Sequence, residues 1–162
     1  MINWLDDNKD LLGLTLAVLG LLVTAYTVLI ARRSQRRDAF MRIHETLLQP
    51  EIQEGRRLLF NISRLEDVPA LGTSEYHLIN RALAMYDTLG HYVAQGYVSE
   101  RHVLDVWHHS IRDIRAPAEL FIAVRAARHR TSWKPWPYLR KLFDKAAAFR
   151  SIEDCCTPPD GG

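Results

Sequence analysis

Residues 11–31 read LLGLTLAVLGLLVTAYTVLIA, a run of 21 residues without a charged side chain. As an α-helix rising about 1.5 Å per residue, this run is about 31 Å long, which matches the hydrocarbon thickness of a bilayer. A buried helix in a chain of 162 residues is rarely apolar on every face over such a length. The sequence therefore predicts a transmembrane helix over residues 11–31.

The charges on the two sides of this run differ. Before it, three aspartates stand against one lysine, and after it come four arginines: Arg32, Arg33, Arg36 and Arg37. A cleaved signal peptide has the opposite order, with a basic start and a shorter apolar core. Because basic residues stay on the cytoplasmic side of a membrane, we expect a single-pass protein of the inner (plasma) membrane, with its N-terminus outside and its remaining residues in the cytoplasm.

Small residues form one seam along the predicted transmembrane helix. They recur at alternating spacings of four and three residues: Gly13, Ala17, Gly20, Thr24, Thr27 and Ala31. Among the other 15 positions of the run, only Thr15 and Ala25 are small. Small side chains let helix backbones approach closely in a membrane, so the seam predicts self-association into a homo-oligomer. Docking against a different membrane protein, or a chance register of residues common in membrane helices, are the alternatives.

After the arginines, apolar residues follow a helical period, and prolines and glycines mark the breaks. We expect one helix to end before Pro50 and a second to run from Pro50 to about Arg64. A loop over residues 65–73 then leads to a helix with Ser74 as its N-cap and Gly96 as its C-cap.

Three further helices are expected in the remainder of the chain. Ser99 caps the first of them, Pro117 starts the next, and the last follows Pro137. The sequence therefore predicts an all-α fold, in which the transmembrane helix is followed by a compact bundle of five or six cytoplasmic helices. The predicted organisation is a short extracytoplasmic tail (1–10), a transmembrane helix (11–31), a helical domain (32–150) and a flexible tail (151–162).

No residue pattern in the domain matches a catalytic motif. His102, Asp105 and His109 share a predicted helix face, but a fourth ligand is missing and their spacing is not a zinc signature. The sequence has no glycine-rich phosphate loop and no nucleophile elbow. The adjacent Cys155 and Cys156 cannot close a structural loop, so we expect two free thiols. We expect no enzymatic activity, no metal and no cofactor.

Charge is distributed unevenly along the domain. Residues 38–100 hold nine acids and five bases, whereas residues 115–150 hold nine bases and two acids. Cationic and aromatic side chains together suit the headgroup region of a membrane, which makes five residues candidates for membrane-surface contact: Trp133, Lys134, Trp136, Arg140 and Lys141. Packing of the tryptophans in the core is the main alternative. A nucleic-acid surface uses the same residue types, but we do not expect nucleic acid as a partner.

Several landmarks lie along the chain. They are the leading apolar helix followed by arginines, residues 92–99 (YVAQGYVS), the helix that contains Arg125, and residues 137–142 (PYLRKL). In this layout the chain resembles a family of small bacterial membrane-anchored helical proteins that is known only as a domain of unknown function. The resemblance implies the single-pass architecture and a bacterial inner membrane, and it implies no activity.

Together these features predict a membrane-anchored interaction or regulatory module at the cytoplasmic face. Its expected partners are membrane lipid, further copies of the chain and, as an additional candidate, another protein. The alternative is an oligomeric pore or membrane-disrupting effector, in which glycines and threonines of the seam border a narrow lumen.

Overall fold

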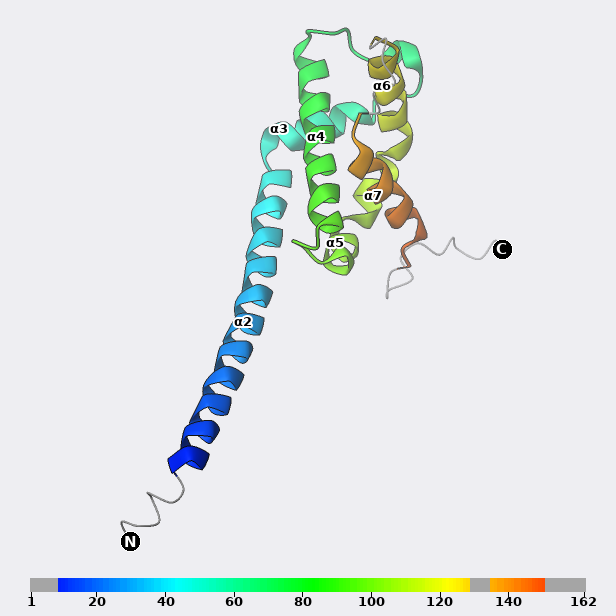
Figure 1. Ribbon diagram of the computed structural model, residues 1–162. Helices are drawn as coiled ribbons and strands as arrows, with labels where there is room; N and C mark the ends of the chain where they lie inside the picture. Colours follow the sequence, from blue (N-terminus) through cyan, green and yellow to red (C-terminus); the bar gives the residue numbers. More distant parts are fainter. Residues whose placement is uncertain (1–8, 129–134, 151–162) are drawn as a thin grey trace, which may run out of the picture. The chain divides into compact units, whose positions relative to one another are not determined.

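The computed structural model describes residues 9–128 and 135–150, and all regular structure in these ranges is helical (Figure 1). This confirms the predicted all-α fold, with a long apolar N-terminal helix followed by a helical domain. The elements are α2 (Lys9–Leu47), α3 (Pro50–Leu59), the 3₁₀ turn η1 (Leu65–Asp67), α4 (Ser74–Ala94), α5 (Glu100–Asp113), α6 (Arg115–Arg128) and α7 (Pro137–Ala148).

The chain divides into two compact units, Met1–Asp38 and Ala39–Gly162. Helix α2 contributes to both, because it continues without a break from Lys9 to Leu47. Its part in the first unit holds the apolar run. Its part in the second unit supplies Ile43 and Leu47 to the core of the helical domain, where they are 4% and 1% exposed.

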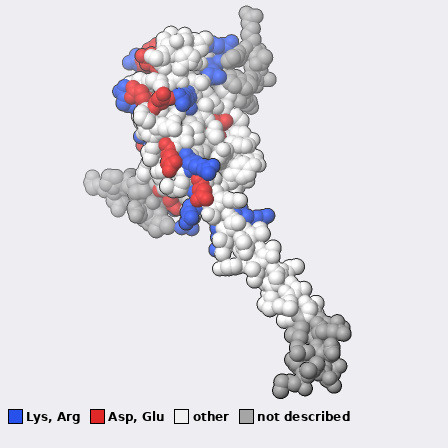
Figure 2. All heavy atoms as spheres, turned by 90° about the vertical axis from the view of Figure 1, so that its left-hand side faces the viewer, with Lys and Arg blue, Asp and Glu red and all other residues white. Residues whose placement is uncertain are grey.

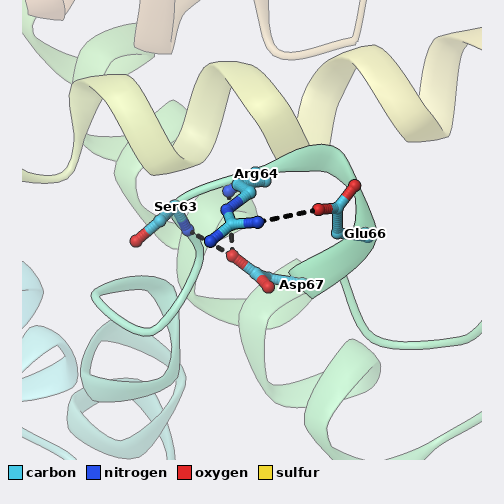
Figure 3. Close-up of polar contacts among 4 residues, drawn as sticks. All are labelled: Ser63, Arg64, Glu66 and Asp67. Carbon is cyan, nitrogen blue, oxygen red and sulfur yellow. Dashed lines mark hydrogen bonds and ion pairs between the residues drawn. The ribbon is translucent and has the colours of Figure 1, made fainter.

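The connection between α3 and α4 differs from the prediction. Helix α3 ends at Leu59 and not near Arg64. The chain after it is held by Asp67, whose Oδ2 accepts hydrogen bonds from the backbone N–H groups of Ser63 and Arg64, both at 2.9 Å (Figure 3). Arg64 also forms an ion pair with Glu66 at 3.3 Å. These local side-chain bonds compete with helical hydrogen bonds, so the helix stops before the residues that make them.

The N-cap of α4 is Thr73 and not Ser74. The Thr73 hydroxyl accepts a hydrogen bond from the backbone N–H of Tyr76 at 3.3 Å, so the predicted cap was wrong by one residue. The C-terminal end shows a similar offset, since Gln95 is the C-cap and Gly96 follows it with φ of 69°. This left-handed conformation favours glycine and ends the helix.

The predicted start of α5 is confirmed, whereas α6 begins earlier than predicted. Ser99 is confirmed as the N-cap of α5, where its hydroxyl accepts a hydrogen bond from the backbone N–H of His102 at 3.5 Å. Helix α6 begins at Arg115, two residues before Pro117. Proline is tolerated there because the first turn of a helix has no intrahelical acceptor for its N–H groups.

Helix α4 packs against both α3 and α7 (Figure 1). Two glycines permit this close approach. A Cβ atom on Gly55 would overlap the backbone carbonyl of Leu78, and one on Gly90 would lie 2.5 Å from the carbonyl oxygen of Tyr138. Both glycines are therefore required by contacts inside the domain.

The N-terminus of α7 is held by a carboxylate from α4. Asp87 Oδ1 accepts hydrogen bonds from the backbone N–H groups of Tyr138 at 2.9 Å and Leu139 at 2.8 Å. The local N-cap, Trp136, makes no side-chain cap and has φ of 53°. Asp87 thus satisfies the N–H groups that a local capping residue normally satisfies.

Candidate functional site

The apolar part of α2 is a candidate membrane span. Among the described residues, one helix is long and apolar enough to cross a bilayer, over Gly13–Leu47, with a mean hydropathy of 2.3 in its most apolar window. None of that window is buried, whereas the core helix of a soluble protein is mostly buried. Figure 2 shows this segment without charged side chains where it is described.

Every position of the small-residue seam is exposed in this chain. A Cβ atom added to Gly13 or Gly20 would meet nothing within 4 Å. The hydroxyls of Thr24 and Thr27 donate to the carbonyl oxygens of Gly20 and Val23 at 2.8 Å each, so these donors are satisfied within the helix. The seam therefore presents a smooth surface with no unsatisfied hydroxyl donor.

The four arginines after the apolar run are all exposed on α2. Arg37 lies near a carboxylate, with its Nε 4.0 Å from Asp38 Oδ1. Arg32, Arg33 and Arg36 form no ion pair with any other described residue. These three cations thus have no protein counter-charge in the described part of the chain.

The candidates for membrane-surface contact are separated by the structure. Trp133 and Lys134 lie outside the described residues. Trp136 is half-buried, with its ring stacked on Phe121 at a centroid distance of 6.1 Å and the Arg125 guanidinium 5.0 Å from its centre. Arg140 and Lys141 are exposed on α7. Trp136 therefore contributes to core packing, and lipid contact by the two cations remains a prediction.

Two of the three α5 residues that were considered as metal ligands, Asp105 and His109, contact arginines. Asp105 lies 3.9 Å from Arg101, and His109 Nδ1 lies 3.5 Å from Arg112 Nη2. Within the ranges that the structure covers, no group of three or more His, Cys, Asp or Glu residues is placed to hold a metal ion. Cys155 and Cys156 lie outside those ranges.

A polar contact that sequence reasoning missed joins α2 to α5 within the helical domain. The indole Nε1–H of Trp107 donates to His44 Nδ1 at 3.2 Å, and Phe40 stacks on the His44 ring at 5.8 Å. Trp107 is only 5% exposed, so its N–H depends on this acceptor. The bond requires an unprotonated Nδ1 on His44.

A second missed group lies between α3, α4 and α5. Arg56 Nη1 donates to Ser110 Oγ at 2.9 Å, and the Tyr86 hydroxyl lies 3.0 Å from the same oxygen. Burial raises the pKa of the Tyr86 phenol above its usual 10.0, although the bond to Ser110 and the charge of Arg56 act in the opposite direction. The sequence signal that could have indicated this group is Ser110, a polar residue within the apolar stripe of a helix.

The chemistry of this group is that of a structural hydrogen-bond cluster. Activation of a serine as a nucleophile needs an adjacent general base, and the two described partners of Ser110 are a guanidinium and a phenol. Neither accepts a proton near neutral pH. The cluster therefore fixes three helices relative to one another.

Comparison with known proteins places the chain in a family. Residues 14–145 match the model of the family described as Domain of unknown function (DUF4760). No curated protein and no solved structure matches the chain. The matched range begins inside the apolar run and continues through most of α7, so it includes both units. The chain belongs to the DUF4760 family.

Proposed function

We propose that this protein is a membrane-anchored, non-enzymatic interaction module that self-associates through the apolar part of α2. The observation that carries the proposal is the exposure of this segment. Its large apolar side chains between Leu14 and Ile30 are 46% to 73% exposed. Transfer of a fully exposed side chain of this kind out of water is favourable by roughly 1.5–3 kcal/mol, and these side chains retain about half or more of that exposure, so the segment requires a cover, and its length fits a bilayer.

The family match supports a permanent anchor. A signal peptide is removed from the mature protein, but the match begins at residue 14 and runs on into the helical domain. The family match therefore includes most of the apolar run together with the helical domain. The arginines that follow it favour a cytoplasmic location for the helical domain.

Self-association is supported by a contrast between glycines. Gly55 and Gly90 each have a neighbouring backbone that excludes a side chain, whereas Gly13 and Gly20 have no neighbour within 4 Å. A glycine in a helix interior costs about 1 kcal/mol relative to alanine. Close contact with a second copy of the chain would explain why glycine occupies positions 13 and 20.

The interaction role of the helical domain is supported by its surface, since the polar groups named in its interior bond to one another. The buried hydroxyl of Tyr86 and the indole of Trp107 are engaged in bonds that join helices. The domain surface carries mixed Lys, Arg, Asp and Glu side chains on the face drawn in Figure 2. Such a surface keeps a domain soluble and offers charged contacts to a protein partner.

The test is energy transfer between labelled full-length copies in liposomes. The Gly13→Leu/Gly20→Leu variant should reduce association at least about tenfold, because bulky side chains separate the backbones at the seam. Ala25→Leu is the control, since it adds an apolar side chain of the same type outside the seam. Unchanged transfer in the double variant would show that the seam is not the interface. Oligomers of four or more copies that conduct ions would support the pore instead.

A further inference from the structure

We propose that Arg32, Arg33, Arg36 and Arg37 form a binding site for the phosphate headgroups of anionic phospholipids. These four residues are called the arginine face below. The inference rests on the proposed function, because it requires the apolar part of α2 to lie in a bilayer. It adds the chemical class of lipid that the anchor selects.

The arginine face is a compact patch of one helix. All four residues belong to α2 within the first unit. At about 100° and 1.5 Å per residue, they fall within an arc of about 140° and a rise of about 7.5 Å. The four guanidinium groups are thus presented to one side of the helix, within reach of one or two neighbouring headgroups.

The small-residue seam lies on the opposite side of the same helix. The mean direction of the seam is about 170° from the centre of the arginine face, by the same helical geometry. Two uncharged residues between the arginines, Ser34 and Gln35, point toward the seam side, as does the acidic Asp38 that follows Arg37. Two copies that meet at their seams therefore keep their arginines apart and direct them to lipid.

The charges on the arginine face are available to a ligand. Arg37 is the one member with a described carboxylate nearby, Asp38 at 4.0 Å, and both side chains are well exposed at 77% and 60%. A guanidinium offers five donors in a planar fork that matches two phosphate oxygens. The predicted apolar run ends at Ala31, so the arginines follow at the depth of the headgroups.

The ligand is a lipid of net negative charge. A zwitterionic headgroup carries its own cation beside the phosphate and so gains less from a guanidinium. Near an anionic leaflet, each basic residue contributes up to about fivefold to binding, an effect that salt weakens. We therefore expect the full chain to prefer anionic over zwitterionic lipid by at least about fivefold at low salt.

The test measures lipid selectivity with spin-labelled phosphatidylglycerol and phosphatidylcholine around the reconstituted full chain. Replacing Arg32, Arg33 and Arg36 by glutamine should reduce the preference for phosphatidylglycerol toward one. The matched control removes the same charge from exposed positions of the helical domain, with glutamine in place of Arg64, Arg101 and Arg112, and should keep the preference. An equal loss in both variants would overturn the inference, because net charge alone would then explain the selectivity.

A charge-conserving variant tests the geometry itself. Exchanging Arg33 with Gln35 and Arg36 with Ser34 leaves the composition unchanged but moves two cations to the seam side. We expect this variant to lose self-association, because the two moved cations would face their counterparts across the seam, and to show a weaker lipid preference, because the four cations no longer form one compact patch. Retention of both would overturn the inference.

Extraction at alkaline pH separates the two proposals. A wild-type chain that stays in the membrane but shows no preference for phosphatidylglycerol would overturn the lipid site and leave the anchor intact. A chain that is extracted as a soluble protein would overturn both.

Discussion

Replacement of Gly90 with alanine places a methyl group against the backbone of α7. The new Cβ would lie 2.5 Å from the Tyr138 carbonyl oxygen, so α7 must move by about 0.9 Å to restore ordinary van der Waals contact. A movement of this size lengthens the bonds from Tyr138 and Leu139 to Asp87, now 2.9 and 2.8 Å, beyond hydrogen-bond distance.

The energetic cost follows from those two bonds. Hydrogen bonds to a charged group contribute about 1.5–3 kcal/mol each, and alanine returns about 1 kcal/mol of helix propensity. The Gly90→Ala variant should therefore lose about 2–5 kcal/mol of unfolding free energy in the helical domain. We would measure this loss by urea unfolding of the full chain in detergent, with tryptophan fluorescence as the signal.

The control for this experiment is Gly20→Ala, because a Cβ at Gly20 meets nothing within 4 Å. Gly20 lies outside the helical domain whose unfolding is followed, so the free energy of unfolding of that domain should change by no more than about 0.5 kcal/mol. A Gly90→Ala variant as stable as wild type would refute the packing described for α4 and α7.

Three further predictions concern the domain interior and its caps. Ser110→Ala should destabilise the domain by about 1–3 kcal/mol in a denaturant titration, because the buried Tyr86 hydroxyl and Arg56 lose a shared partner; a loss below about 0.5 kcal/mol would count against the cluster. Burial raises the pKa of Tyr86 above 10.0, so the unfolded chain releases this proton first and stability falls as pH rises above the usual value. Tyr86→Phe should flatten the decline above pH 10, as followed by circular dichroism, and an unchanged slope would contradict this assignment. Thr73→Ala should cost about 1 kcal/mol and Ser74→Ala much less, and the reverse order of their thermal midpoints would restore Ser74 as the cap.

The features that sequence predicted well are local. The run at residues 11–31 is read from composition, and the breaks at Pro50 and Gly96 follow from backbone chemistry. Ser99 was identified as a cap because a hydroxyl residue preceded an apolar helical stripe. At Thr73 and Ser74 two such residues are adjacent, and local reasoning could not choose between them.

The features that sequence did not predict are long-range. Asp87 caps a helix that begins 50 residues later, and it does so because α4 and α7 come close at Gly90. The bond from Trp107 to His44 joins residues 63 positions apart. The spacing of the partners in the sequence predicts neither pairing, because the partners meet only after the helices pack. The earlier end of α3 has a local cause, the Asp67 side chain, which competed with an otherwise helical pattern.

The depth of α2 in a bilayer shows most directly whether this helix is a membrane anchor. Single spin labels placed along residues 12–38 of the full chain in nanodiscs would be probed with oxygen, which concentrates in the hydrocarbon, and with a polar nickel complex, which stays in water. We expect an oxygen maximum near Leu21 and access to the nickel complex from Arg32 onward. High nickel accessibility throughout residues 12–31 would show that this segment does not span a membrane.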